Sequence, residues 1–187
     1  GARKGDIVTV EAPRGAIVYT VKKIERGNFN PTNRIDYVLD LTKGYNNLLQ
    51  KKERGYTQSY FWDGKVVGML DEEKMSSQYY MQDELGSVLR LVDDTGALKE
   101  CYGYDEFGRD LYENQGMTQP FGYTGYQYDI VTGTYYAQAR EYRTGEGRFD
   151  GRDLFAGATN IPITMNRYTY CFNNSMALVD LNGAWPS

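Results

Sequence analysis

Short runs of alternating apolar and polar residues, separated by turn residues, fill most of this chain. In residues 1–26, Ile17, Tyr19 and Val21 follow the turn sequence Ala-Pro-Arg-Gly at every second position, and Thr20 and Lys22 are expected on the opposite face. Apolar residues at every second position, together with a turn sequence, predict a β-hairpin. Residues 27–36 are polar and rich in Asn, Pro and Gly, as expected of a linker.

Strand-and-turn units with one or two aromatic residues each then occupy residues 37–150. The stretch YTQSYFWDGKVVGML predicts a hairpin that reverses at Asp63-Gly64, a pair typical of a type I′ turn. Further turns are expected at 83–86, 94–96 and 105–108, each with Asp at its start and Gly at its end. A spacing of about ten residues is typical of antiparallel sheets. The expected fold is therefore all-β, built from similar strand-turn-strand units with little helix.

The amino-acid composition favours β-strands and excludes several kinds of catalytic and metal site. The 187 residues include 18 Tyr and 21 Gly, which suit packed sheets and tight turns. The net charge is −4 with acids and bases interspersed, so no basic stripe favours nucleic-acid binding. The absence of His excludes Ser-His and Cys-His mechanisms and His-ligated metals, so no metal site and no cofactor is expected.

The two cysteines, the apolar runs and the N-terminus bear on disulfides, membrane spans and signal peptides. Cys101 and Cys171 are expected as free thiols, with a disulfide as the alternative. No apolar run approaches the roughly 20 residues that span a bilayer. The N-terminus lacks the apolar region of a signal peptide and begins with Gly, so a chain trimmed or cut from a longer one is expected.

The first 25 residues, GARKGDIVTVEAPRGAIVYTVKKIE, contain a Lys-x-Gly-Asp-x-Val strand and an Ala-Pro-x-Gly turn. In these features they resemble the C-terminal end of a Gre-type bacterial transcription elongation factor. That family acts through acidic residues at the tip of an N-terminal coiled coil, and nothing in this sequence resembles it. A chance hairpin is the alternative.

Six motifs follow one another in a fixed order through the rest of the chain. They are YMQDELGS (80–87), YDEFGR (104–109), FGYTGYQYD with TGTYYAQAR (121–140), GRF followed by Arg-Asp (147–153), NRYTYCFNN (166–174) and VDLNG (179–183). Together they resemble the RHS repeat-associated core domain of YD-repeat proteins, over about residues 37–187. The resemblance implies a bacterial secreted or cell-surface protein whose hairpins wind into a hollow β-shell that the core domain plugs.

The same resemblance implies an aspartyl self-cleavage site in the closing segment, residues 151–187. By motif, the catalytic candidates are Asp153 and Asp180, with Arg152 as a charge partner. The cut would fall between Ala184 and Trp185. Two carboxylates close together do not both ionise easily, so one can activate water while the other protonates the leaving amine.

The sequence departs from the family pattern around these residues. Leu154 and Leu181 stand where the family has Pro after each Asp. Ala184 replaces the usual Leu before the cut, and Thr169 stands where some members have a further Asp. These changes favour a non-enzymatic, structural role or a vestigial cleavage site.

Each candidate catalytic residue also has a possible non-catalytic role in the fold. Asp153 and Asp180 would form turns by accepting backbone N–H groups. Arg152 and Arg140 would be structural partners of carboxylates. Asn182-Gly183 is also prone to succinimide formation, because Gly leaves the Asn side chain open to backbone attack, although a turn explains both residues.

The expected partners follow from the resemblance and from the aromatic residues. The resemblance implies an upstream YD-repeat shell or a cargo toxin in a longer parent protein, with no cargo in the three residues after the predicted cut. A shell fragment would also leave an unpaired strand edge near residues 37–60. Tyr60 and Trp62 raise a glycan-binding module as the alternative function. Alternation places Phe61 on the opposite face from Trp62, and packing of these aromatics in the sheet is the favoured interpretation.

Overall fold

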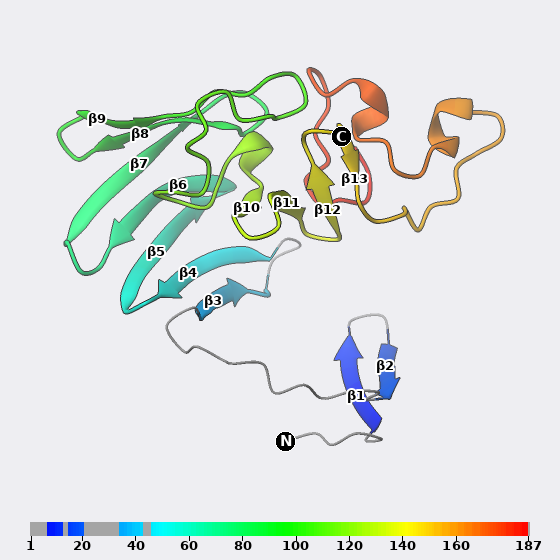
Figure 1. Cartoon of the computed structure of the whole chain (residues 1–187), viewed down its shortest axis with the longest axis horizontal. Helices are drawn as coiled ribbons and strands as arrows, with labels where there is room; N and C mark the ends of the chain where they lie inside the picture. Colours follow the sequence, from blue (N-terminus) through cyan, green and yellow to red (C-terminus); the bar gives the residue numbers. More distant parts are fainter. Residues whose placement is uncertain (1–6, 13–14, 21–33, 43–45, 187) are drawn as a thin grey trace. The chain divides into compact units, whose positions relative to one another are not determined.

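The computed structural model describes residues 7–12, 15–20, 34–42 and 46–186 (Figure 1). The chain divides into two compact units, Gly1–Arg34 and Ile35–Ser187. Within the described residues all elements are strands or short 3-10 turns, the latter being η2 (Tyr123–Gly125), η3 (Pro162–Met165) and η4 (Cys171–Asn173). The predicted all-β fold is confirmed. None of these described helical turns is long and apolar enough to cross a membrane.

The first unit contains one hairpin. Strand β1 (Ile7–Ala12) pairs antiparallel with β2 (Gly15–Thr20). The register runs from Ile7 opposite Thr20 to Ala12 opposite Gly15. Val21 and the linker residues 27–33 lie outside the described residues, and the next strand begins at Ile35.

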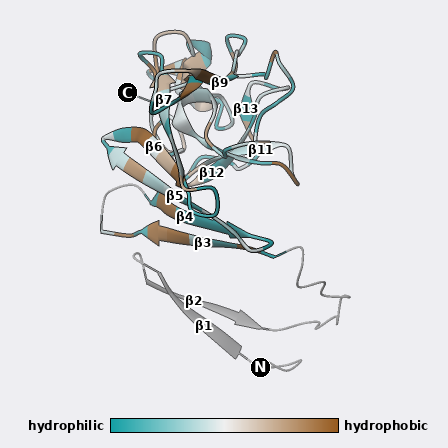
Figure 2. Cartoon of the chain, turned by 90° about the vertical axis from the view of Figure 1, so that its left-hand side faces the viewer, coloured by the Kyte–Doolittle hydropathy of each residue, from teal (hydrophilic) through white to brown (hydrophobic). Residues whose placement is uncertain are grey.

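The second unit is dominated by a seven-stranded antiparallel sheet in which neighbours in sequence are neighbours in space (Figure 1). Its strands are β3 (Ile35–Asp40), β4 (Asn47–Glu53), β5 (Tyr56–Asp63), β6 (Lys65–Asp71), β7 (Ser76–Gln82), β8 (Val88–Asp93) and β9 (Leu98–Cys101). The outer edge of β3 pairs with no other described strand. Tyr37 and Val38 are exposed on β3, which is largely apolar (Figure 2).

Apolar doublets bend three strands of this sheet. In β4, Leu48 pairs with Leu39 while Gln50 pairs with Val38, so Leu49 has no residue opposite it. The same shift leaves one unpaired residue in β6 and in β8. In each doublet the first residue is buried and the unpaired second is exposed: Leu48 and Leu49, Val66 and Val67, Val88 and Leu89. A β-bulge increases the local twist of a strand, so the repeated doublet curves the sheet.

Asp-x-x-Gly turns recur four times with the same hydrogen bonds. The Gly N–H donates to the Asp carbonyl oxygen at 3.0–3.4 Å. The N–H of the residue after Gly donates to Oδ1 of the same Asp at 2.7–3.0 Å. Each Gly has a positive φ, which a residue without Cβ adopts at little cost. The turns begin at Asp83, Asp93, Asp105 and Asp180 and end at Gly86, Gly96, Gly108 and Gly183.

Two turn predictions need correction. The second turn begins at Asp93 rather than Asp94, because Oδ1 of Asp93 accepts the backbone N–H bonds. The β5–β6 reversal is not a two-residue type I′ turn, since Asp63 pairs with Lys65 and the chain reverses at Gly64. The bulge in β6 shifts the register by one residue, which changes the turn.

Aromatic rings fill two neighbouring cores. Phe121 enters the first core, and the rings of Tyr60, Trp62 and Tyr80 meet it nearly edge-on at centroid distances of 5.2, 5.2 and 6.0 Å. The second core is rich in Tyr and packs under a four-stranded sheet. This sheet consists of β10 (Gln127–Asp129), β11 (Thr134–Ala137), β12 (Arg140–Arg143) and β13 (Arg148–Phe149).

Candidate functional site

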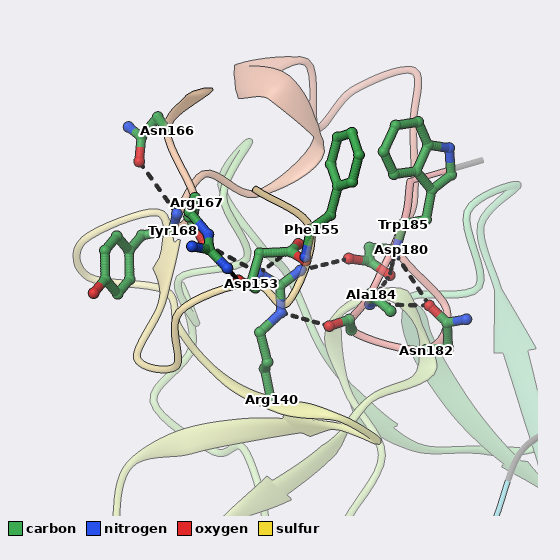
Figure 3. Close-up of polar contacts among 11 residues, drawn as sticks. Arg140, Asp153, Phe155, Asn166, Arg167, Tyr168, Asp180, Asn182, Ala184 and Trp185 are labelled. Atoms are coloured by element: carbon green, nitrogen blue, oxygen red, sulfur yellow. Dashed lines mark hydrogen bonds and ion pairs between the residues drawn. The ribbon is translucent and has the colours of Figure 1, made fainter. Parts of the chain in front are cut away.

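Arg140 joins the two predicted catalytic carboxylates. Its Nη1 lies 3.0 Å from Oδ2 of Asp153, and its Nη2 lies 3.2 Å from Oδ2 of Asp180 (Figure 3). The side chain of Arg140 is 8% exposed, and its guanidinium carbon lies 3.7 Å from the centroid of the Phe149 ring. The two carboxyl groups therefore face one guanidinium, whose single positive charge can balance only one of them when both are ionised.

Arg140 reaches this position because it begins β12 directly after the β11–β12 turn. The closing segment packs against that turn: the N–H of Ala139 donates to the carbonyl oxygen of Asn182 at 3.1 Å, and Nε of Arg140 donates to that of Gly183. A Cβ on Gly183 would lie 2.2 Å from the carbonyl oxygen of Ala137. Only a glycine allows so close an approach, and its φ of 65° also favours Gly.

Asp180 is the most buried of the turn-forming aspartates, at 1% exposure. Its Oδ1 accepts the N–H groups of Ala184 at 3.0 Å and Trp185 at 3.2 Å. Burial raises the pKa of Asp180 above its ordinary value, although the N–H of Ala184 and the charge of Arg140 offset part of the effect. Asp180 consequently keeps its proton to a higher pH than an exposed Asp.

Asp153 is held by the segment that leads into the site. Its N–H donates to the carbonyl oxygen of Arg167 at 2.9 Å, and a guanidinium N–H of Arg167 donates to the carbonyl oxygen of Asp153. Oδ1 of Asp153 accepts the N–H of Phe155 at 2.8 Å. One carboxylate oxygen therefore closes a local turn, and the other meets Arg140.

A small cavity lies where these groups converge. It has a volume of about 30 Å³ and is lined by Arg140, both carboxylates, Ala184 and Trp185 among others. A water molecule needs roughly 10–15 Å³ of such space and several polar partners. Thr169, which stands where some family members have an Asp, also lines it.

The structure brings together four of the five residues predicted for the cleavage site. Asp153, Asp180, Ala184 and Trp185 all line the cavity, whereas Arg152 does not. The side chain of Arg152 is exposed, and Arg140 occupies the position between the carboxylates. From the sequence, Arg140 is expected only as a structural partner of carboxylates, and its place at the end of the TGTYYAQAR motif is the signal for its role here.

The two residues predicted to bind a glycan lie in the other core. Tyr60 is buried, and Trp62 is half-buried with its Nε1 donating to the carbonyl oxygen of Leu48 at 2.8 Å. Trp62 also lines a second cavity, of about 110 Å³, between the two sheets. Phe61 points to the opposite face and is 53% exposed, as alternation predicts.

Two features define the class of protein. Asp-x-x-Gly turns connect strands of the antiparallel meander at Asp83 and Asp93, and a Tyr-rich core packs under the adjoining four-stranded sheet, as expected of a YD-repeat shell segment. Residues 35–176 match the family model described as Teneurin YD-shell. The chain therefore belongs to the YD-shell family, which confirms the resemblance to RHS and YD-repeat proteins. The matched region does not reach the Gre-like residues 1–25, whose resemblance stays a prediction.

Two of the relatives that the chain matches are a nuclease and a toxin. The chain is 29% identical over 165 residues to the tRNA(Glu)-specific nuclease WapA of Bacillus subtilis subsp. natto, covering 74% of this chain and 7% of that protein. It is 26% identical over 159 residues to the toxin protein Tse5 of Pseudomonas aeruginosa, covering 85% of this chain and 12% of that protein. The chain thus spans a small fraction of the length of these relatives.

Solved structures share the fold. A crystal structure of TcdB2-TccC3 superposes with a TM-score of 0.60 and 18% identity, over 95% of this chain and 10% of that one. A structure of the Photorhabdus luminescens Tc holotoxin pore gives the same TM-score and identity over 97% of this chain. The chain is a YD-shell domain that is similar in sequence to the toxin protein Tse5 and in fold to TcdB2-TccC3.

Proposed function

We propose that this chain is the closing part of the YD shell of a longer toxin-delivery or cell-surface protein, and that it cuts itself between Ala184 and Trp185. The related toxin and nuclease proteins support the first half of the proposal.

One observation carries the second half. The nitrogen of the candidate scissile bond, the backbone N of Trp185, lies 3.2 Å from Oδ1 of Asp180. A general acid must be within hydrogen-bond reach of the atom that it protonates. Asp180 meets this condition in distance: Oδ1 accepts the N–H of Trp185 in the structure and can return a proton to that nitrogen only as the C–N bond breaks. Burial raises the pKa of Asp180, which favours the protonated form that an acid needs.

The proposed reaction is hydrolysis. A water molecule in the cavity loses a proton to Asp153, and its oxygen attacks the carbonyl carbon of Ala184. The C–N bond then breaks as Asp180 transfers its proton to the nitrogen of Trp185. The products are a carboxyl group on Ala184 and a free amine on Trp185. Arg140 orients both carboxylates through two separate N–H groups.

Intact mass after purification tests this function. The wild-type chain should lose the tripeptide that begins at Trp185, whereas Asp153→Asn and Asp180→Asn should stay at full length. Asp150→Asn is the matched control, because Asp150 forms an exposed pair with Arg143 outside the cavity. A wild-type chain of full length that the variants do not alter would exclude self-cleavage and leave the structural role.

A second candidate function is glycan binding at the cavity beside Trp62. Its lining combines aromatic rings with side-chain amides, including Asn47, Gln82, Gln127 and Tyr136. Aromatic faces and amides are groups that can stack on and hydrogen-bond to sugar rings. A glycan array should then give a signal that Trp62→Ala removes. No signal, or equal binding by the variant, would reject this candidate.

A further inference from the structure

The side chain of Trp185 is held by two phenylalanines that the proposed chemistry does not use. Its ring meets Phe155 at a centroid distance of 5.5 Å and Phe172 at 5.8 Å (Figure 3 shows Phe155 and Trp185). The interplanar angles are 79° and 78°, so both contacts are edge-to-face. Aromatic pairs prefer this geometry because the positive edge of one ring meets the negative face of another.

The backbone that presents Phe172 is in an uncommon conformation. Cys171, Phe172 and Asn173 have φ values of 46°, 53° and 61°, so three consecutive residues other than Gly are left-handed. Each such residue costs free energy, and runs of them are rare. Strain of this kind persists where the surrounding structure requires it, and it clusters at functional sites. Here it lies in the segment whose Phe172 contacts the residue after the candidate cut.

From these contacts we infer that Phe155 and Phe172 form an aromatic clamp that selects an aromatic side chain at position 185, the leaving side of the cut. This inference rests on the proposed self-cleavage. The clamp fixes the ring of Trp185, and the ring fixes the backbone nitrogen beside Asp180. A misplaced nitrogen would be protonated poorly, since small displacements of reacting groups lower rates strongly.

The clamp is open on one side, which defines what it accepts. Trp185 is 52% exposed, so the size of the side chain is not tightly limited. Phe or Tyr can make the same edge-to-face contacts, whereas Leu cannot. Phe155 and Phe172 are therefore positioning residues, and position 185 determines specificity.

The test follows the cleavage rate of the full chain. The protein is made by cell-free translation, synthesis is stopped, and the loss of full-length mass is timed. Trp185→Phe should cleave within about threefold of wild type, and Trp185→Leu about tenfold more slowly. Phe172→Leu should slow the wild-type residue about tenfold but add little to Trp185→Leu. Phe61→Leu, on the exposed face of the large sheet, should change nothing.

The outcomes separate the clamp from the chemistry. Wild-type cleavage with an equally fast Trp185→Leu variant would overturn the clamp and leave self-cleavage standing. Equal slowing by Phe172→Leu in the wild-type and Trp185→Leu backgrounds would show a merely structural role and also overturn it. A wild-type chain that never cleaves would remove the proposed self-cleavage and the clamp with it.

Discussion

Oδ1 of Asp180 accepts the backbone N–H of Trp185 at 3.2 Å, in addition to the N–H of Ala184 that closes its turn. The same Asp-x-x-Gly turn recurs at Asp83, Asp93 and Asp105, whose side chains are less buried. Turn formation and chemistry are therefore not competing explanations for Asp180. The turn that the fold uses throughout places this carboxyl group at the candidate scissile bond.

Replacement of Asp180 by Asn should lower stability. The amide oxygen can still accept the turn N–H groups, but the NH2 group then faces Nη2 of buried Arg140 in place of the Oδ2 acceptor. Loss of a charge-assisted bond at a buried site costs roughly 1–3 kcal/mol. Urea unfolding should show this decrease for Asp180→Asn. An Asp180→Asn chain as stable as wild type would indicate that the ion pair contributes nothing.

Replacement of Arg140 by Met should be more damaging than either Asp substitution. It would remove the one guanidinium that contacts both carboxyl groups, and the loss of one partner from a buried pair typically costs about 3–5 kcal/mol. Because protonation neutralises carboxylates left without this cation, the deficit should shrink as the pH is lowered from neutral. Denaturant midpoints at several pH values measure it, and a deficit independent of pH would contradict the bridging role.

Replacement of Gly183 by Ala should loosen the closing segment. The new Cβ would meet the carbonyl oxygen of Ala137 in a backbone conformation that already disfavours Ala. A loss of at least about 2 kcal/mol is expected. Gly64→Ala is the matched control, since Gly64 has a similar φ of 69° but open space around it. Equal losses in the two variants would rule out the close approach as the cause.

The raised pKa of Asp180 predicts how cleavage depends on pH. The general acid is lost as the pH rises through this pKa, so the cleavage rate should fall on the alkaline side. Stability should change in the same direction. Because the pKa of Asp180 is raised in the folded chain, its contribution to the free energy of unfolding is fully present below its unfolded pKa and is lost as the pH rises through its folded pKa. Rates timed across a pH series check this, and a rate that increases steadily with pH would contradict an acid role.

Local signals explain how much of the fold could be predicted. Alternation placed Phe61 outward and Trp62 inward, and Asp and Gly marked the turns, because these preferences act within a few residues. The bulges shifted the register at Asp63 by one residue, which no local pattern revealed. Bulges depend on the fit between neighbouring strands rather than on one of them.

The site was predictable only in part. Family-like motifs identified Asp153 and Asp180, but adjacency in sequence favoured Arg152 as their cation. Arg140 is 40 residues from Asp180 in sequence and meets it only because the closing segment packs on the β11–β12 turn. A contact of this range is set by tertiary packing, and one sequence contains no direct signal for it.

The most direct measurement locates the cut chemically. The chain is synthesised in water enriched in oxygen-18, and its C-terminal peptide is analysed by mass spectrometry. Self-cleavage predicts a chain ending at Ala184 with one heavy oxygen in its new carboxyl group, and no such product from Asp180→Asn. A chain that keeps Trp185 in the wild-type protein, or a cut at another bond, would contradict the account.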